Sequence, residues 1–400
     1  MEIKIHIILV TLSCYVFAYH DFTCKKKTVL LLIRRPAFEF SIRLLQRVAE
    51  DTNAHFVLSP LTTWLQMIAL SDGARGETFD EILKLTRQKH SKCFKRKFHQ
   101  VIPRLQRGLR YKTKRQSVMV IDKGVLPKTQ FILEMQEVYG IDVMVLDFNK
   151  PTASSFQVNR LVDDVTGGII DGVVYEDDFI DTVLLMSDAN FFHSVWQTEF
   201  FRGYTQTRTF FSSHGAAIGT VNMMYQTGYF CMVEIPQIGV KVLELPLGNP
   251  GISMLFFLPT TKAWVGELFY NLEKLDLITI FNFFKIEEQR LVNVAIPKFI
   301  QVTEVENLSE LLYDMGIKRI FDRELSELEG VGEYNVHASV MTQVTHIRVN
   351  EKGLSFGVDF DSANESSVEF IADRPFAYMV VDKTINFIIY AGAYSVPSLV

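Results

Sequence analysis

The spacing of apolar residues changes along this chain, and that change limits the folds it can adopt. Helical spacing dominates the first half, where Phe38, Ile42, Leu45 and Val48 recur every three to four residues. Strand patterns such as residues 291–299 dominate the second half. Helices and strands do not alternate and no internal repeat is present, so the order predicts an α+β fold. The 400 residues suffice for one large domain or two small ones.

Individual segments carry the pattern of a single element. We expect helices over residues 36–50, 61–69, 79–85, 128–139, 155–174, 268–284 and 304–316. We expect strands over residues 116–121, 182–192, 291–299, 344–350, 376–381 and 386–390, and a strand-to-helix junction over 56–60. Gly167 and Gly168 loosen the fifth of these helices, 155–174.

The first 18 residues have the pattern of a signal peptide. The apolar run from Ile5 to Ala18 ends with small residues, which favours cleavage after Ala18. The alternative is a membrane anchor, but the run is shorter than the ~20 residues that span a bilayer. We therefore expect a secreted, extracellular protein without a membrane segment, with a single domain over residues 19–400.

Export bears on the cysteines and on two glycosylation motifs. Cys24, Cys93 and Cys231 remain after cleavage, so at most one intramolecular disulfide and one spare thiol are expected. Their spacing matches no zinc site, and buried or idle cysteines are favoured over a reactive role. Asn307 and Asn364 each begin an Asn-x-Ser motif, so we expect a glycoprotein.

A basic stretch without any Asp or Glu runs from residue 82 to 121. It holds thirteen Lys and Arg, whereas the whole chain has a net charge of −5. Apolar spacing within it predicts an amphipathic helix with a basic face, bent or broken at Pro103. Two interpretations are open: a surface for a sulfated polysaccharide, or a solvated face without a ligand. The candidate polyanion-binding residues are Lys92, Lys95, Arg96 and Lys97.

Motifs of metal, phosphate and dinucleotide sites are absent from the sequence. There is no His-Glu-x-x-His, no phosphate loop and no dinucleotide fingerprint. We expect no enzyme activity, no cofactor, no metal site and no nucleic-acid partner. His193, His337 and His346 are scattered along the chain and are interpreted as structural.

Several motifs resemble those of the serpins, protease inhibitors that are cleaved in an exposed loop and then insert this loop into their own sheet. The resemblance rests on residues 56–62, 73–78, 191–196, 295–299, 308–321 and 373–376, which occur in serpin order and span nearly all of the mature chain. It implies a monomeric fold of three β-sheets and eight or nine helices, with a reactive-centre-like loop over about 351–370. The unusual loop and general look also resemble secreted serpins of insect accessory glands.

The loop departs from the inhibitory pattern of the family. Glu351 and Gly353 match the hinge, where inhibitory serpins continue with Thr and then several Ala. Four apolar residues occupy one face of the segment here: Leu354, Phe356, Val358 and Phe360. Overfilling a packed interior costs roughly 1–3 kcal/mol per site, so these side chains oppose insertion. The plainer interpretation is that the chain tolerates Phe at these positions.

Two further regions differ from the family. The cluster at which the sheet opens resembles a Ser, Ser, Asn and His group, and its counterparts are Ser59, Thr62, Asp188 and Gln343, with Trp196 nearby. A buried Asp188 needs a donor or a shifted pKa. The scissile bond falls within Asn364, Glu365, Ser366 and Ser367, a stretch without Lys, Arg or a large apolar residue.

These departures favour a secreted serpin-family protein that does not inhibit proteases and instead binds an extracellular protein. The alternative is a suicide-substrate inhibitor of a serine protease. A glycosaminoglycan is the candidate ligand of the basic helix.

Overall fold

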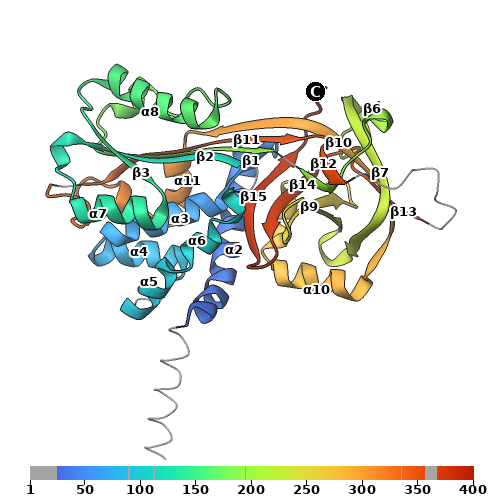
Figure 1. Cartoon of the computed structure of the whole chain (residues 1–400), viewed down its shortest axis with the longest axis horizontal. Helices are drawn as coiled ribbons and strands as arrows, with labels where there is room; N and C mark the ends of the chain where they lie inside the picture. Colours follow the sequence, from blue (N-terminus) through green and yellow to red (C-terminus); the bar gives the residue numbers. More distant parts are fainter. Residues whose placement is uncertain (1–24, 89–90, 111–112, 194, 335, 356–366) are drawn as a thin grey trace, which may run out of the picture.

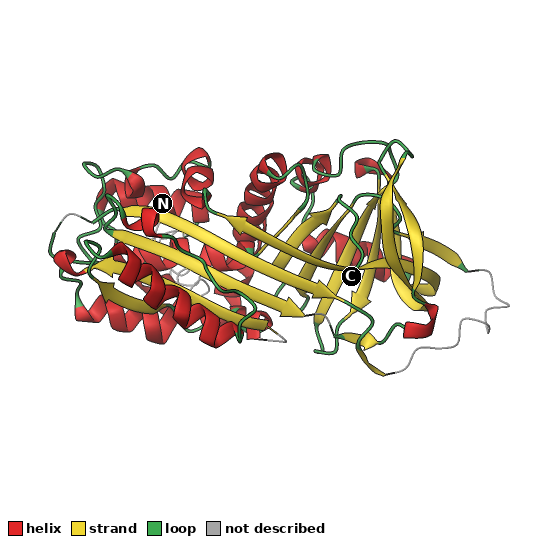
Figure 2. Ribbon diagram, turned by 90° about the horizontal axis from the view of Figure 1, so that it is seen from above, coloured by secondary structure: helices red, strands yellow, loops and turns green. Residues whose placement is uncertain are grey.

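A computed structural model describes residues 25–88, 91–110, 113–193, 195–334, 336–355 and 367–400. Most helices gather at one end of the molecule, and long strands run from there to a second, strand-rich end that α10 borders (Figures 1 and 2). The described residues contain ten α-helices: α2(Lys26–Asp51), α3(Pro60–Gly73), α4(Gly76–Thr86), α5(Lys92–His99), α6(Ile102–Leu105), α7(Thr129–Glu134), α8(Pro151–Thr166), α9(Glu267–Leu272), α10(Leu277–Glu287) and α11(Leu308–Asp314). None of them is long and apolar enough to cross a membrane.

The strands follow the sequence patterns closely. They are β1(Phe56–Leu58), β2(Thr113–Asp122), β3(Asp142–Leu146), β4(Leu184–His193), β5(Trp196–Thr198), β6(Gln206–Phe211), β7(Ala217–Ile235), β8(Val240–Pro246), β9(Ile252–Pro259), β10(Gln289–Val305), β11(Ala338–Val349), β12(Gly353–Ser355), β13(Val368–Ile371), β14(Phe376–Asp382) and β15(Phe387–Tyr394). The α+β prediction is confirmed.

Thirteen strands form one hydrogen-bonded network because two long strands bend from one part into the next. The three parts have the orders β3-β2-β4-β11-β10, β1-β15-β14-β9-β8-β7 and β6-β7-β10-β13, and the long strands β7 and β10 connect them. A separate pair joins β12 to β5. These parts correspond to the three sheets that the resemblance implies.

The five-stranded part is covered on both faces. Helix α8 lies over one face, and α3, α4 and α5 lie beneath the other (Figure 1). Val158 and Val162 of α8 pack on Val118 and Val120 of β2, which forms a small second core. The main core on the opposite face includes Met186 of β4. Both faces of the central strands are therefore buried.

Several predicted helices have different ends, with local causes. The expected 155–174 helix begins earlier, at Pro151, and ends at Thr166, because Gly167 adopts a left-handed conformation with φ of 67°. The 268–284 segment is two helices. The basic stretch breaks between α5 and α6, where Pro103 lies in the first turn of α6. These breaks bring the helix count above the expected eight or nine.

Candidate functional site

The strand β11 leads into the predicted hinge, and Glu351 holds the turn between them. Glu351 is buried, and its carboxylate accepts a hydrogen bond from Thr205 Oγ1 at 3.0 Å. Lys298 Nζ lies 3.9 Å from the other oxygen. The backbone carbonyl of Glu351 accepts from the Phe200 N–H at 2.9 Å. Glu351 thus fixes the point from which the loop departs.

Gly353 matches the family hinge for a steric reason. It pairs with Trp196 in the parallel β12–β5 ladder, and a Cβ at this position would lie 2.4 Å from the Glu199 backbone nitrogen. Leu354 follows with 66% of its surface exposed. A separate short parallel pair, β12–β5, therefore follows the β4–β11 pair and extends to Ser355.

The rest of the predicted loop lies outside the described residues. This applies to Phe356, Val358, Phe360 and to the scissile region from Asn364 to Ser366. The chain returns at Ser367, whose Oγ accepts from Asn293 Nδ2 at 2.8 Å. Strand β13 then runs parallel to β10, with Phe370 opposite Val294. The chain thus passes from the end of the five-stranded part to the β6-β7-β10-β13 part.

The polar cluster beneath the seam between β4 and β11 is built around Gln343. Gln343 is fully buried, and its Oε1 accepts from the Ser59 N–H at 2.6 Å. Its Nε2 donates to Thr62 Oγ1 at 3.0 Å and to Thr63 Oγ1 at 3.1 Å. Three of the predicted residues, Ser59, Thr62 and Gln343, therefore meet, and Thr63 is an additional member.

Asp188 is bonded elsewhere, although it is the register partner of Gln343. Its carboxylate forms an ion pair with Arg115 Nη2 at 2.8 Å and accepts a hydrogen bond from Asn190 Nδ2 at 2.7 Å. Asp188 is fully buried and the Arg115 side chain is 13% exposed. The buried carboxylate thus has the donors that the sequence analysis required.

Trp196 does not belong to that cluster. Asp188 lies in the middle of β4, whereas Trp196 begins β5, beyond the end of β4. Its indole N–H donates to the Asn350 carbonyl at 2.7 Å, and its ring packs against Phe200 at 5.7 Å between centroids. Trp196 supports the hinge.

The basic stretch is divided by acids from other parts of the chain. Lys95 Nζ lies 2.8 Å from Asp72, Arg107 pairs with Asp382 at 3.0 Å, and Arg115 pairs with Asp188. Lys97 donates to the Gln100 side chain at 3.5 Å. Lys92 and Arg96 are exposed on α5 and have no acidic partner among the described residues. Lys95 is thus the predicted cation whose charge is most neutralised.

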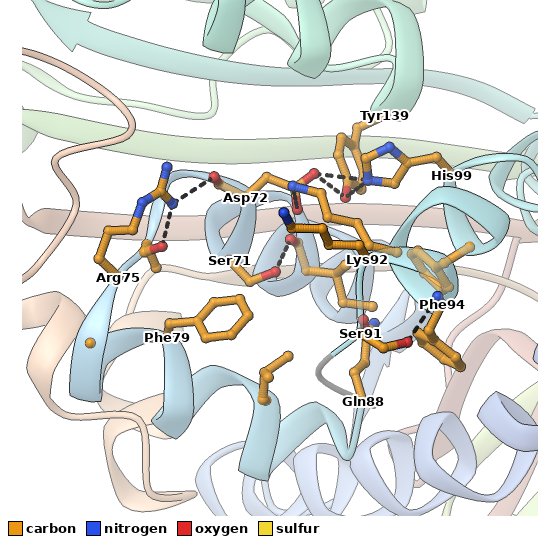
Figure 3. A pocket seen from close by; sticks show the side chains of 16 residues that line it. Ser71, Asp72, Arg75, Phe79, Gln88, Ser91, Lys92, Phe94, His99 and Tyr139 are labelled. Carbon is orange, nitrogen blue, oxygen red and sulfur yellow. Dashed lines mark hydrogen bonds and ion pairs between the residues drawn. The ribbon is translucent and has the colours of Figure 1, made fainter. Parts of the chain in front are cut away.

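Asp72 anchors a cluster that the sequence patterns did not indicate (Figure 3). Its carboxylate accepts from Tyr139 OH at 2.8 Å and lies 3.0 Å from His99 Nε2. Burial alone would raise the pKa of Asp72, but the His99 hydrogen bond and the Lys95 ammonium outweigh it, so the pKa is lowered. Burial and the charge of Asp72 raise the pKa of nearby Glu134.

This cluster includes three side chains with metal-ligand chemistry. Ligand atoms of Asp72, His99 and Glu134 lie within 4.8 Å of one another. The ammonium of Lys95 already supplies positive charge beside Asp72, so the group is satisfied as an ion-pair network. Its members come from α3, α5 and α7, which are distant in the sequence, and no local pattern could have identified it.

The remaining predictions concern modification. Asn307 is exposed at the start of α11, and its amide donates to Asp51 Oδ2 at 3.0 Å. Cys93 is disulfide-bonded, and Cys231 is free, with burial raising the pKa of its thiol. The other cysteines, Cys14 and Cys24, lie outside the described residues.

The architecture and the hinge define a class: a mixed α+β protein in which strand β11 of a large sheet leads into a hinge at Glu351 and Gly353. The sequence profile described as "Serpin (serine protease inhibitor)" matches residues 37–397. The chain belongs to the serpin family.

Similar proteins agree with this assignment. The chain is 26% identical to Serpin B5 of Mus musculus, with 90% of this chain and 97% of that protein covered. It is also 26% identical to antithrombin-III of Homo sapiens, covering 90% and 80%. Among solved structures, native protease nexin-1 with heparin has a TM-score of 0.80 at 22% identity, covering 92% of this chain and 99% of that one. Serpins in general are protease inhibitors rather than enzymes.

Proposed function

We propose that this serpin is an exported protein that binds an extracellular partner and does not trap proteases. The observation that carries the proposal is the hinge. Gly353 is held tightly in the β12–β5 pair, and the first of four large apolar residues, Leu354, follows directly.

Trapping a protease by the family mechanism requires the cleaved loop to enter between β4 and β11. These strands are joined over ten register pairs, from Ala338–Leu184 to Arg348–His193. Buried side chains fill both faces of the seam, with Leu185 towards α8 and Met186 towards the main core. Phe356 and Phe360 would have to be accommodated there, which overpacking penalises. Slow insertion lets the protease hydrolyse the loop and leave.

A panel of serine proteases tests the proposal. Because the scissile region lacks basic and large apolar residues, the panel includes enzymes that cleave after small and acidic residues. We expect cleavage within 361–367 without a covalent complex on a denaturing gel. The matched variant carries Leu354→Thr, Phe356→Ala, Val358→Ala and Phe360→Ala together. A stable complex with the unaltered protein would reject the proposal.

The second candidate function is suicide inhibition of a serine protease. Glu351 and Gly353 keep the hinge pattern, and β4 pairs directly with β11, so the described sheet has no strand inserted between them. Most similar proteins are protease inhibitors. The same gel distinguishes the two functions.

A polyanion is proposed as a ligand of α5. Lys92 and Arg96 are exposed on this helix and have no acidic partner among the described residues. The structure of protease nexin-1 was determined with heparin, which supports the choice of a sulfated polysaccharide.

A further inference from the structure

A cavity of about 630 Å³ lies between α3, α4 and α5 (Figure 3). This volume is within the ~300–1,000 Å³ typical of small-molecule sites. Its walls are mostly apolar and include Ile68, Phe79, Leu83, Phe94 and Phe98. The hinge and the seam between β4 and β11 contribute no residue to it.

Some polar groups at the edge of the cavity already have hydrogen-bond or ion-pair partners within the protein, and others do not. Asp72 is the acid that lines the cavity, and its two oxygens are engaged by Lys95, His99 and Tyr139. The Arg75 guanidinium donates to the carbonyl of Asp72 at 3.3 Å. These groups form a closed network and leave little for a ligand.

Two donors that line the cavity are unused among the described residues. The Gln88 Nε2 atom is buried and has no hydrogen-bond acceptor there. Lys92 is exposed at the edge of the cavity and has no acidic partner in that part of the chain. A buried N–H without an acceptor costs about 1–3 kcal/mol, so an acceptor at this position would be favourable.

We propose that this cavity binds an amphipathic organic anion, with its apolar body among the aromatic side chains and its carboxylate on Lys92 and Gln88. A neutral apolar molecule would leave both donors without an acceptor, and a cation would be repelled by the Lys92 ammonium. The inference is independent of the function of the loop, and its site shares Lys92 with the proposed polyanion surface.

Dodecanoate is the probe, and its neutral counterpart dodecanol is the matched ligand. Isothermal titration calorimetry on the full secreted chain should show one saturable site for dodecanoate, with dodecanol at least tenfold weaker. Lys92→Glu changes an exposed residue and should weaken dodecanoate at least tenfold without affecting dodecanol. Gln88→Leu should weaken dodecanoate several-fold. Equal binding of acid and alcohol, unchanged in Lys92→Glu, would overturn carboxylate recognition.

A second cavity of about 530 Å³, lined by Ile278 and Phe281, provides the control for location. Leu83→Trp fills the proposed cavity and should abolish binding, whereas Ile278→Trp fills the second one and should leave binding unchanged. The reverse result would overturn the assignment, as would the absence of any saturable binding. Arg96→Ala should alter heparin retention but not dodecanoate affinity, which separates the two surfaces.

Discussion

Asp188 and Gln343 face each other in register across the β4–β11 seam, yet their side chains bond in opposite directions. Gln343 is tied to the α3 junction through Ser59 and Thr62, whereas Asp188 is tied to Arg115 of β2. Among the described residues, no side-chain hydrogen bond joins the two. A side-chain bond does cross the seam one residue earlier, from Thr342 Oγ1 to Ser187 Oγ at 2.8 Å. At the Asp188–Gln343 position itself, the side chain on each strand is therefore bonded to its own side of the seam.

Separate anchoring predicts that mutations at these two residues act independently. Gln343→Ala leaves the buried Ser59 N–H without its acceptor and should lower the free energy of unfolding by about 1–3 kcal/mol. In the double variant with Asp188→Asn, the loss of unfolding free energy should equal the sum of the two single losses to within ~0.5 kcal/mol, as measured by urea unfolding. Exposed Gln130→Ala is the control. A coupling above that level would show that the two side chains form one network.

The Arg115–Asp188 ion pair should be strongly coupled. Asp188→Asn leaves the Arg115 guanidinium with little exposure and no counter-charge, and should cost about 3–5 kcal/mol in unfolding free energy. Arg115→Met together with Asp188→Asn should recover most of this loss. If the double variant is as unstable as the sum of the single ones, the pair is not what stabilises this part of the sheet.

Loop cleavage should change the melting temperature little. In family members that insert the loop, an added strand gains main-chain hydrogen bonds and buried area. We expect a small rise or none after a nick near Asn364, because Phe356 and Phe360 oppose insertion. The variant with Thr and Ala at the four hinge positions is the comparison, and its melting temperature should rise more on cleavage. A rise of tens of degrees in the unaltered protein would contradict this prediction.

Acid should destabilise the protein partly through Asp72. Its folded pKa is below its ordinary value of 3.8, so its contribution is present above that value and is lost as pH falls through the folded pKa. Asp72→Asn should therefore be less stable than the unaltered protein at neutral pH, and the difference should shrink below pH 3.8. Unfolding free energies of both proteins across this range provide the measurement. A constant difference would exclude the role of this carboxylate.

Heparin retention should depend unequally on the four predicted residues, three lysines and one arginine. Replacing Lys92, Arg96 and Lys97 by Ala should lower the salt concentration for elution, and adding Lys95→Ala should have a smaller effect because of Asp72. Lys262, Lys274 and Lys285, all exposed, form the control triple of equal charge. Equal loss from both triples would indicate a response to net charge alone.

Export predicts a processed and glycosylated chain. Mass spectrometry of protein from a secretory host should show a start near Tyr19 and sugar on Asn307 or Asn364. The exposure of Asn307 is compatible with modification. An intact first residue without a glycan at either position would exclude both predictions.

Local sequence was enough to determine the fold. The α3 start at Pro60 and the strands β4, β10 and β14 follow from short-range patterns, whereas the requirement for Gly353 comes from the Glu199 backbone packed beside it. Tertiary structure alone decided which side chains meet. Lys95 finds Asp72, and Arg115 turns Asp188 away from Gln343, because strand register and helix packing bring together residues from distant segments. The spacing of residues in the sequence does not give the distance between side chains in the fold. The charge of each residue was therefore predictable, but its partner was not.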